Sequence, residues 1–120
     1  MTRRYRYVDL VTEEGVELYI EEYVEIKKTP KGAWVRRAYS GGTVGKKRFV
    51  LDGSGRRLCH QTKEQAWESF KLRKKWQASR AQAQLDRAKY AIEQIANFEN
   101  APAESSVLGK PDFWHSYVFD

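Results

Sequence analysis

The stretch from Thr62 to Glu99 reads TKEQAWESFKLRKKWQASRAQAQLDRAKYAIEQIANFE and contains no proline or glycine. Most of its positions hold Ala, Leu, Lys, Arg, Gln or Glu, which are strong helix formers. Thr62 is a good N-cap, and Gln65 three residues later completes a capping box. Pro102 lies just beyond the end of the pattern. The stretch predicts one helix over residues 62–99, about 55 Å long.

The predicted helix has two halves with different apolar patterns. In the first half, Trp67 and Phe70 form a patch that we expect to contact the sheet. In the second half, apolar residues recur at steps of three and four, as in a coiled-coil seam; they are Ala78, Ala81, Leu85, Ala88, Ile92 and Ile95. This seam and the length of the helix favour a homo-oligomer with the seam at its interface. A single amphipathic helix lying on its own sheet is the alternative.

Residues 1–61 have the alternation and the turns of an antiparallel sheet. The predicted strands are 3–11, 16–27, 33–39, 46–51 and a short fifth strand at 56–60, with a flexible loop at 40–45 and a tight hairpin at 52–55. In the second strand one face is apolar and is expected to form the core; its residues are Val16, Leu18, Ile20, Val24 and Ile26. The opposite face, with Glu17, Tyr19, Glu21, Tyr23 and Glu25, is expected to meet water.

The predicted fold class is therefore α+β, a single domain over residues 1–120. It comprises an antiparallel four- or five-stranded sheet (1–61), one long C-terminal helix (62–99) and a tail (100–120). The tail ends in a run of aromatic residues between Phe113 and Phe119. A disordered tail would be poor in aromatics, so this one is expected to dock.

Composition excludes several classes of protein. No apolar run approaches 18 residues and no charged-then-apolar leader is present, so a cytoplasmic protein without a membrane segment is expected. The single Cys59 excludes an internal disulfide and is expected to be a structural thiol, and two histidines, His60 and His115, do not make a zinc site. No catalytic motif is present. The sequence therefore predicts neither an enzyme nor a bound cofactor.

The net charge of +6 predicts an anionic partner. Basic clusters with interleaved aromatic residues occupy the middle strands and the start of the helix, where arginine would bind phosphate and aromatic rings would stack on bases. The candidate ligand-binding residues are Trp34, Arg36, Arg37, Tyr39, Lys46, Lys47, Arg48, Arg56, Arg57, Arg73, Lys74 and Trp76. Strand alternation allows only one of Arg36 and Arg37 to face a given ligand. A solvated basic surface without a fixed ligand is the alternative.

A resemblance follows from residues 62–70 and 73–77, preceded by 29–35 and 47–50. Together these sequence segments resemble those of a group of small uncharacterised tailed-phage proteins, in which a β-rich first half precedes a long basic helix. The layout is also similar to that of the anti-Thoeris sponge proteins, which phages use to sequester cyclic nucleotide signals. That second similarity is one of architecture, and no binding residue is transferred from it.

Two functions from different classes are consistent with these patterns. The first is a phage-type anti-defence accessory protein in the cytoplasm of the bacterial host, which sequesters a phosphorylated ligand, such as a nucleotide, as a homo-oligomer. The second is an accessory factor that binds nucleic acid or inhibits a host protein. Salt dependence separates them, because a nucleic-acid binder loses affinity steeply as salt rises.

Overall fold

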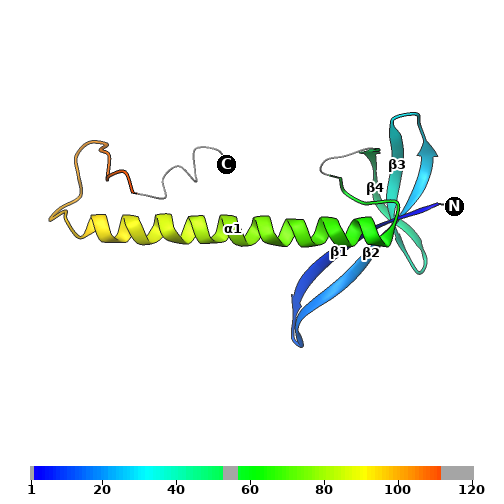
Figure 1. The fold of residues 1–120 in the computed structure, drawn as a ribbon, viewed down its shortest axis with the longest axis horizontal. Coiled ribbons are helices and arrows are strands. Elements are labelled where there is room, and N and C mark those ends of the chain that lie inside the picture. Colours follow the sequence, from blue (N-terminus) through cyan, green and yellow to red (C-terminus); the bar gives the residue numbers. More distant parts are fainter. Residues whose placement is uncertain (1, 53–56, 112–120) are drawn as a thin grey trace. The chain divides into compact units, whose positions relative to one another are not determined.

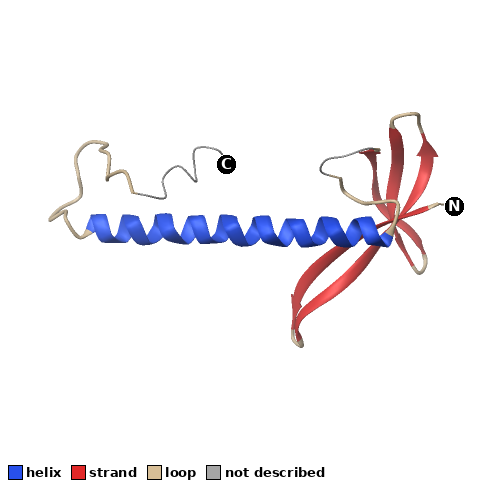
Figure 2. Ribbon diagram, in the orientation of Figure 1, coloured by secondary structure: helices blue, strands red, loops and turns tan. Residues whose placement is uncertain are grey.

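The computed structural model describes residues 2–52 and 57–111 (Figure 1). Their fold is an antiparallel sheet of four strands followed by one long helix, which confirms the predicted fold class (Figure 2). The elements are β1 (Arg3–Thr12), β2 (Gly15–Lys28), β3 (Gly32–Tyr39), β4 (Gly42–Leu51) and α1 (Lys63–Ile95). The strands pair in chain order, β1-β2-β3-β4. The aromatic run of the tail, predicted to dock, and residues 53–55 of the predicted hairpin lie outside this description.

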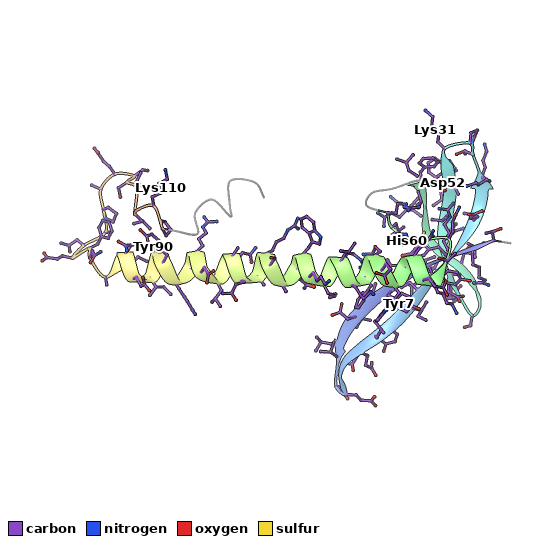
Figure 3. The ribbon with its side chains drawn as sticks, viewed as in Figure 1. Tyr7, Lys31, Asp52, His60, Tyr90 and Lys110 are labelled. Atoms are coloured by element: carbon purple, nitrogen blue, oxygen red, sulfur yellow. The ribbon has the colours of Figure 1, made fainter. Side chains whose placement is uncertain are left out.

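The chain divides into two compact units, Met1–Arg73 and Lys74–Asp120. The first unit contains the sheet and the start of α1. The second contains the rest of α1 and the segment that follows it. Within the second unit, a side chain added at Gly109 would come within 1.9 Å of the Tyr90 hydroxyl, so the segment after the helix packs closely against Tyr90. Figure 3 shows Tyr90 and Lys110 on these two neighbouring segments.

Glycine permits the tight geometry of the sheet at two positions. Gly15 begins β2 with a φ of 124°, which side chains other than glycine rarely adopt, as expected for the turn between β1 and β2. Gly32 begins β3, and a Cβ atom there would lie 2.2 Å from the Val50 carbonyl oxygen. The backbone of β4 can therefore approach β3 only because residue 32 has no side chain.

Two of the sequence-based strand predictions were wrong. The expected loop at 40–45 is largely strand, because β4 begins at Gly42 and Val44 pairs with Arg37. The expected fifth strand at 56–60 is reduced, in its described residues, to one bridge between His60 and Tyr5. Two backbone hydrogen bonds, of 2.7 and 2.8 Å, join these two residues. The chain after β4 therefore returns to the outer edge of β1.

The core lies on the face of β2 that was expected to meet water. Tyr23 is only 8% exposed, whereas Val16 is 72% and Leu18 51% exposed. Because β3 pairs with β2 only from Glu22 to Lys28, the first half of β2 has β1 as its one described neighbour, and its apolar residues remain uncovered. Of the five residues expected in the core, only Val24 is buried. The observed core cluster consists of Tyr23, Ala33, Val35, Val50 and Cys59.

A fully buried arginine stands beside this core. Arg4 is 0% exposed, and its guanidinium donates to Glu25 at 2.8 Å and to Asp52 at 3.0 Å. Lys28 binds the other oxygen of Asp52 at 2.6 Å. Burial opposes the charge of Arg4, but the two carboxylates raise its pKa above the ordinary value. This ion network joins β1, β2 and the residue that follows β4.

The start of α1 follows the sequence-based prediction. The Thr62 hydroxyl accepts a hydrogen bond of 3.1 Å from the amide of Gln65, as an N-cap does. The Trp67 ring meets the Tyr7 ring edge-on, with centroids 5.1 Å apart, and Phe70 lies 6.5 Å from Tyr7. The predicted contact of Trp67 and Phe70 with the sheet is thus confirmed. At the other end the prediction was wrong by four residues: α1 ends at Ile95 rather than at Glu99, because tight turns at Asn97 and Phe98 close it.

Replacing Arg4 with Met should destabilise the protein by roughly 3–5 kcal/mol, because the largely buried Glu25 carboxylate then loses its cationic partner. A second change, Glu25→Met, should restore part of that loss, since it removes the uncompensated charge. Urea unfolding of the single and double variants measures both effects. Equal stability of Arg4→Met and wild type would contradict the role given to the network.

The Cys59 thiol should not react with Ellman's reagent at neutral pH until the protein unfolds. It is fully buried, and burial raises its pKa to about 11 from an ordinary 9.0. The folded state therefore holds this proton where the unfolded chain loses it, so the free energy of unfolding should fall as pH rises from 9 toward 11. Stoichiometric labelling of the native protein within seconds would show that the core is open.

Candidate functional site

The structure distributes the predicted ligand-binding residues over both faces of the sheet. Arg37 is the cross-strand partner of Tyr23, and Arg48 is that of Val35. Both arginines are therefore on the face of the sheet that carries the core. Alternation along β3 places Trp34 and Arg36 on the other face. The predicted separation of Arg36 from Arg37 is therefore observed, and the two side chains have different partners.

One group of predicted residues gathers on the hairpin of β3 and β4. We call Trp34, Arg36, Lys47 and Phe49 the β3–β4 surface. The Trp34 and Phe49 rings are cross-strand partners with centroids 5.4 Å apart. The Lys47 ammonium lies 5.1 Å from the centre of the Trp34 ring, and Arg36 donates to the Gly45 carbonyl at 3.0 Å. This surface combines two aromatic rings with two cations.

The ring of Phe49 was not among the residues predicted to bind ligand. It is 41% exposed and lies beside Trp34 because those two residues are paired in the register of β3 and β4. The alternation of Lys47 and Phe49 along one strand was a signal that could have found it. Its exposure makes the β3–β4 surface open to solvent.

The remaining predicted residues are more scattered. Arg37 forms an ion pair of 2.8 Å with Glu21. Tyr39, Lys46 and Arg48 are exposed. Lys74 and Trp76 belong to the second unit, where Lys74 donates to Gln77 at 2.7 Å. Arg56 lies outside the described residues.

A second group gathers at the outer edge of β1. We call Arg6, Arg57, His60 and Arg73 the β1 edge cluster. His60 pairs with the backbone of Tyr5, and a guanidinium nitrogen of Arg6 donates to the Leu58 carbonyl at 3.0 Å. Arg73, on α1, donates to the Tyr7 carbonyl. Figure 3 shows His60 and Tyr7 where the start of α1 meets β1.

Electrostatics in this cluster are strongly positive. Burial lowers the pKa of His60, and the charges of Arg57, Arg73, Arg6 and Arg4 lower it further. Burial and the charge of Arg6 also lower the pKa of Arg73, against the attraction of Asp9 and Glu21. The neutral imidazole is thus favoured near pH 7, and it lies among several cations.

Sequence reasoning selected Arg57 and Arg73 but missed Arg6 and His60. Arg6 lies in a strand whose alternating pattern does not distinguish a functional residue. His60 is a single histidine without an evident partner in the sequence. Only the return of the chain to the edge of β1 brings them together. No local pattern would have found this grouping.

Other sites are less suited to an anion. The described residues contain no group of three or more side chains that could hold a metal ion. A shallow hollow in the second unit lies between the end of α1 and the segment after it, beside Ile95, Phe98 and Leu108. Its charged lining residues, Glu99 and Glu104, are acidic, so it would repel phosphate.

No helix in residues 2–52 and 57–111 is long and apolar enough to cross a membrane. Comparison with models of protein families, with curated proteins and with solved structures finds no match for this chain. The two basic groups on the sheet are accordingly the starting point for the function.

Proposed function

We propose that the protein binds a phosphorylated ligand stoichiometrically on the β3–β4 surface and that the ligand is single-stranded nucleic acid. The supporting observation is the neighbouring pair of Trp34 and Phe49, with Lys47 over the Trp34 ring. Aromatic rings stack on unpaired bases of any sequence, and nearby cations contact the phosphates. Both kinds of group are present on one face of one hairpin.

The openness of the surface favours a strand over a single enclosed nucleotide. A small-molecule site is normally a concave cavity that buries most of its ligand. Phe49 is 41% exposed, and Lys47 on the same face is also exposed. An extended ligand can cover such a surface with several weak contacts, whereas a free mononucleotide would remain largely in water.

Sequestration of a free nucleotide by a homo-oligomer, in the manner of a phage anti-defence sponge, is the second candidate. The observation that favours it is the exposure of the predicted seam on α1. Leu85 is 47%, Ile92 68% and Ile95 60% exposed, and the alanines of the seam, Ala78, Ala81 and Ala88, are exposed as well. Association through this seam would cover the apolar residues, and pairing of protomers could enclose a ligand that one copy leaves open.

Replacing Trp34 with Ala should weaken binding of a single-stranded oligonucleotide about 5- to 150-fold, because one stacked base is worth about 1–3 kcal/mol. Phe49→Ala should have a similar effect, and Lys47→Ala a smaller one. Fluorescence anisotropy with a labelled oligothymidylate measures the dissociation constants, and circular dichroism checks that the variants fold.

Tyr19→Ala is the matched control for these variants. Tyr19 is an aromatic residue of the same sheet, 42% exposed, and its hydroxyl donates to Glu17, an acidic neighbour that would repel phosphate. The control should bind like wild type. Wild-type protein without measurable affinity for the oligonucleotide, or a Trp34→Ala variant that binds as tightly as Tyr19→Ala, would refute the proposal.

Replacing both Ala81 and Ala88 with Arg should dissociate the expected homo-oligomer, since it adds charge and bulk where two helices would approach. Light scattering of wild type and variant at tens of micromolar gives the masses. Ser79→Arg and Gln84→Arg together provide a control with two added arginines off the seam. A wild-type protein that is already monomeric at this concentration would show that the seam does not associate.

A further inference from the structure

Three consecutive residues of β1 hold the β1 edge cluster together. The backbone of Tyr5 pairs with His60, the side chain of Arg6 binds the Leu58 carbonyl, and the carbonyl of Tyr7 accepts from Arg73. Arg57 adjoins Leu58 in the chain, and its charge acts most strongly on His60 among the four arginines. One short length of β1 therefore gathers three guanidinium groups and an imidazole from three parts of the sequence.

Several polar atoms of this cluster are buried without a hydrogen-bond partner. They are the Nε atoms of Arg57 and Arg73 and both ring nitrogens of His60, for which no described residue provides a partner. His60 as a whole is 6% exposed. Buried polar atoms in proteins are almost always hydrogen-bonded, so each orphan needs an explanation. Four such atoms in one cluster indicate that an acceptor from outside the described chain belongs there.

The charges point to an anion as that acceptor. Arg4, whose charge also acts on His60, is already paired with Glu25 and Asp52. Glu21 is paired with Arg37. Asp9 and Glu21 attract Arg73, against the repulsion of Arg6. Arg6, Arg57 and Arg73 all add positive charge at His60, and such a concentration of like charge is costly in a partly buried site unless an anion balances it.

We propose that the β1 edge cluster binds a phosphate group, at a site separate from the β3–β4 surface. Guanidinium groups match the oxygens of phosphate in bidentate pairs, and arginine is the usual residue for such contacts. A phosphate offers more acceptor oxygens than a carboxylate, which suits the unpartnered nitrogens of Arg57, Arg73 and His60. Its charge also balances more of the three guanidinium groups than a carboxylate would.

His60 gives the site a response to pH. Without an anion, burial and the surrounding cations keep the imidazole neutral, so one ring nitrogen is an acceptor and does not help to bind phosphate. A bound phosphate adds negative charge beside the ring and favours the imidazolium, in which both ring nitrogens donate. Protonation of His60 should therefore strengthen binding, whereas protonation of the phosphate, whose second pKa is about 6, acts in the opposite direction, so the response is read from the titration of His60 itself. The charged groups that act on His60 are Arg57, Arg73, Arg6 and Arg4, and arginine does not titrate near neutral pH.

The first experiment compares inorganic phosphate with chloride at matched ionic strength. Tens of millimolar phosphate should raise the melting temperature of the full chain by about 4 °C or more relative to chloride, because a ligand that binds only the native state stabilises it. Arg57→Gln and Arg73→Gln should each lose most of this shift. Arg80→Gln, the same change at an exposed position of α1, should keep it.

The second experiment follows His60 directly by NMR. The chain has two histidines, so a His115→Gln variant assigns the His60 ring signals. In chloride the midpoint of titration should lie below the ordinary value of 6.5, and in phosphate it should rise by about one pH unit. A purely structural histidine would keep the same midpoint in both salts. This measurement needs no arginine substitution, so it still tests the proposal if an arginine variant fails to fold.

A third experiment with a phosphomonoester distinguishes free phosphate from the terminal phosphate of a larger ligand. In a Trp34→Ala background, which removes stacking on the β3–β4 surface, AMP and inorganic phosphate should both stabilise the protein and adenosine should not. A larger effect of AMP assigns the site to the terminal phosphate of a larger ligand, and an equal effect assigns it to phosphate itself. Equal melting temperatures in phosphate and chloride, with an unmoved His60 midpoint, would overturn this proposal. Loss of oligonucleotide binding alone would overturn only the function proposed above.

Discussion

The buried guanidinium of Arg4 is the constraint on which the first unit depends. It connects β1 to Glu25 on β2 and to Asp52 just after β4. By holding Asp52 close to β1, it favours the return of the following chain to the edge of that strand, where His60 pairs with Tyr5. That return buries Cys59 in the core and begins α1 where Trp67 meets Tyr7. One ion network therefore helps to set the position of both the core and the start of the helix.

Local chemistry explains which elements could be predicted from the sequence. Thr62 and the unbroken run of helix formers determine where α1 begins and that it is long, since capping and propensity act within a few residues. The face that forms the core was not predictable in this way. Val16 and Leu18 alternate as core residues would, yet they are exposed because β3 does not extend beside them. Burial depends on neighbours that the alternation of one strand does not specify.

The candidate sites show the same distinction between local and distant information. Alternation correctly separated Arg36 from Arg37, which have different partners. Arg57 and Arg73 were selected as anion contacts, but their association with Arg6 and His60 depends on the pairing of residue 60 with residue 5. Contacts between residues so far apart in the sequence cannot be recognised from the spacing of residues along the chain. The grouping of cations, rather than their presence, was the part that needed the structure.

The proposed binding of single-stranded nucleic acid depends on the Trp34 and Phe49 rings and on the cations beside them. The most direct measurement is the affinity for a single-stranded oligonucleotide over a range of salt concentrations. With two phosphate contacts, from Arg36 and Lys47, log K should fall against log salt with a slope of about −1.4, since each contact contributes about −0.7. Residual affinity at high salt should come from stacking on Trp34 and Phe49. An absence of binding at low salt, or a slope near zero, would contradict the account.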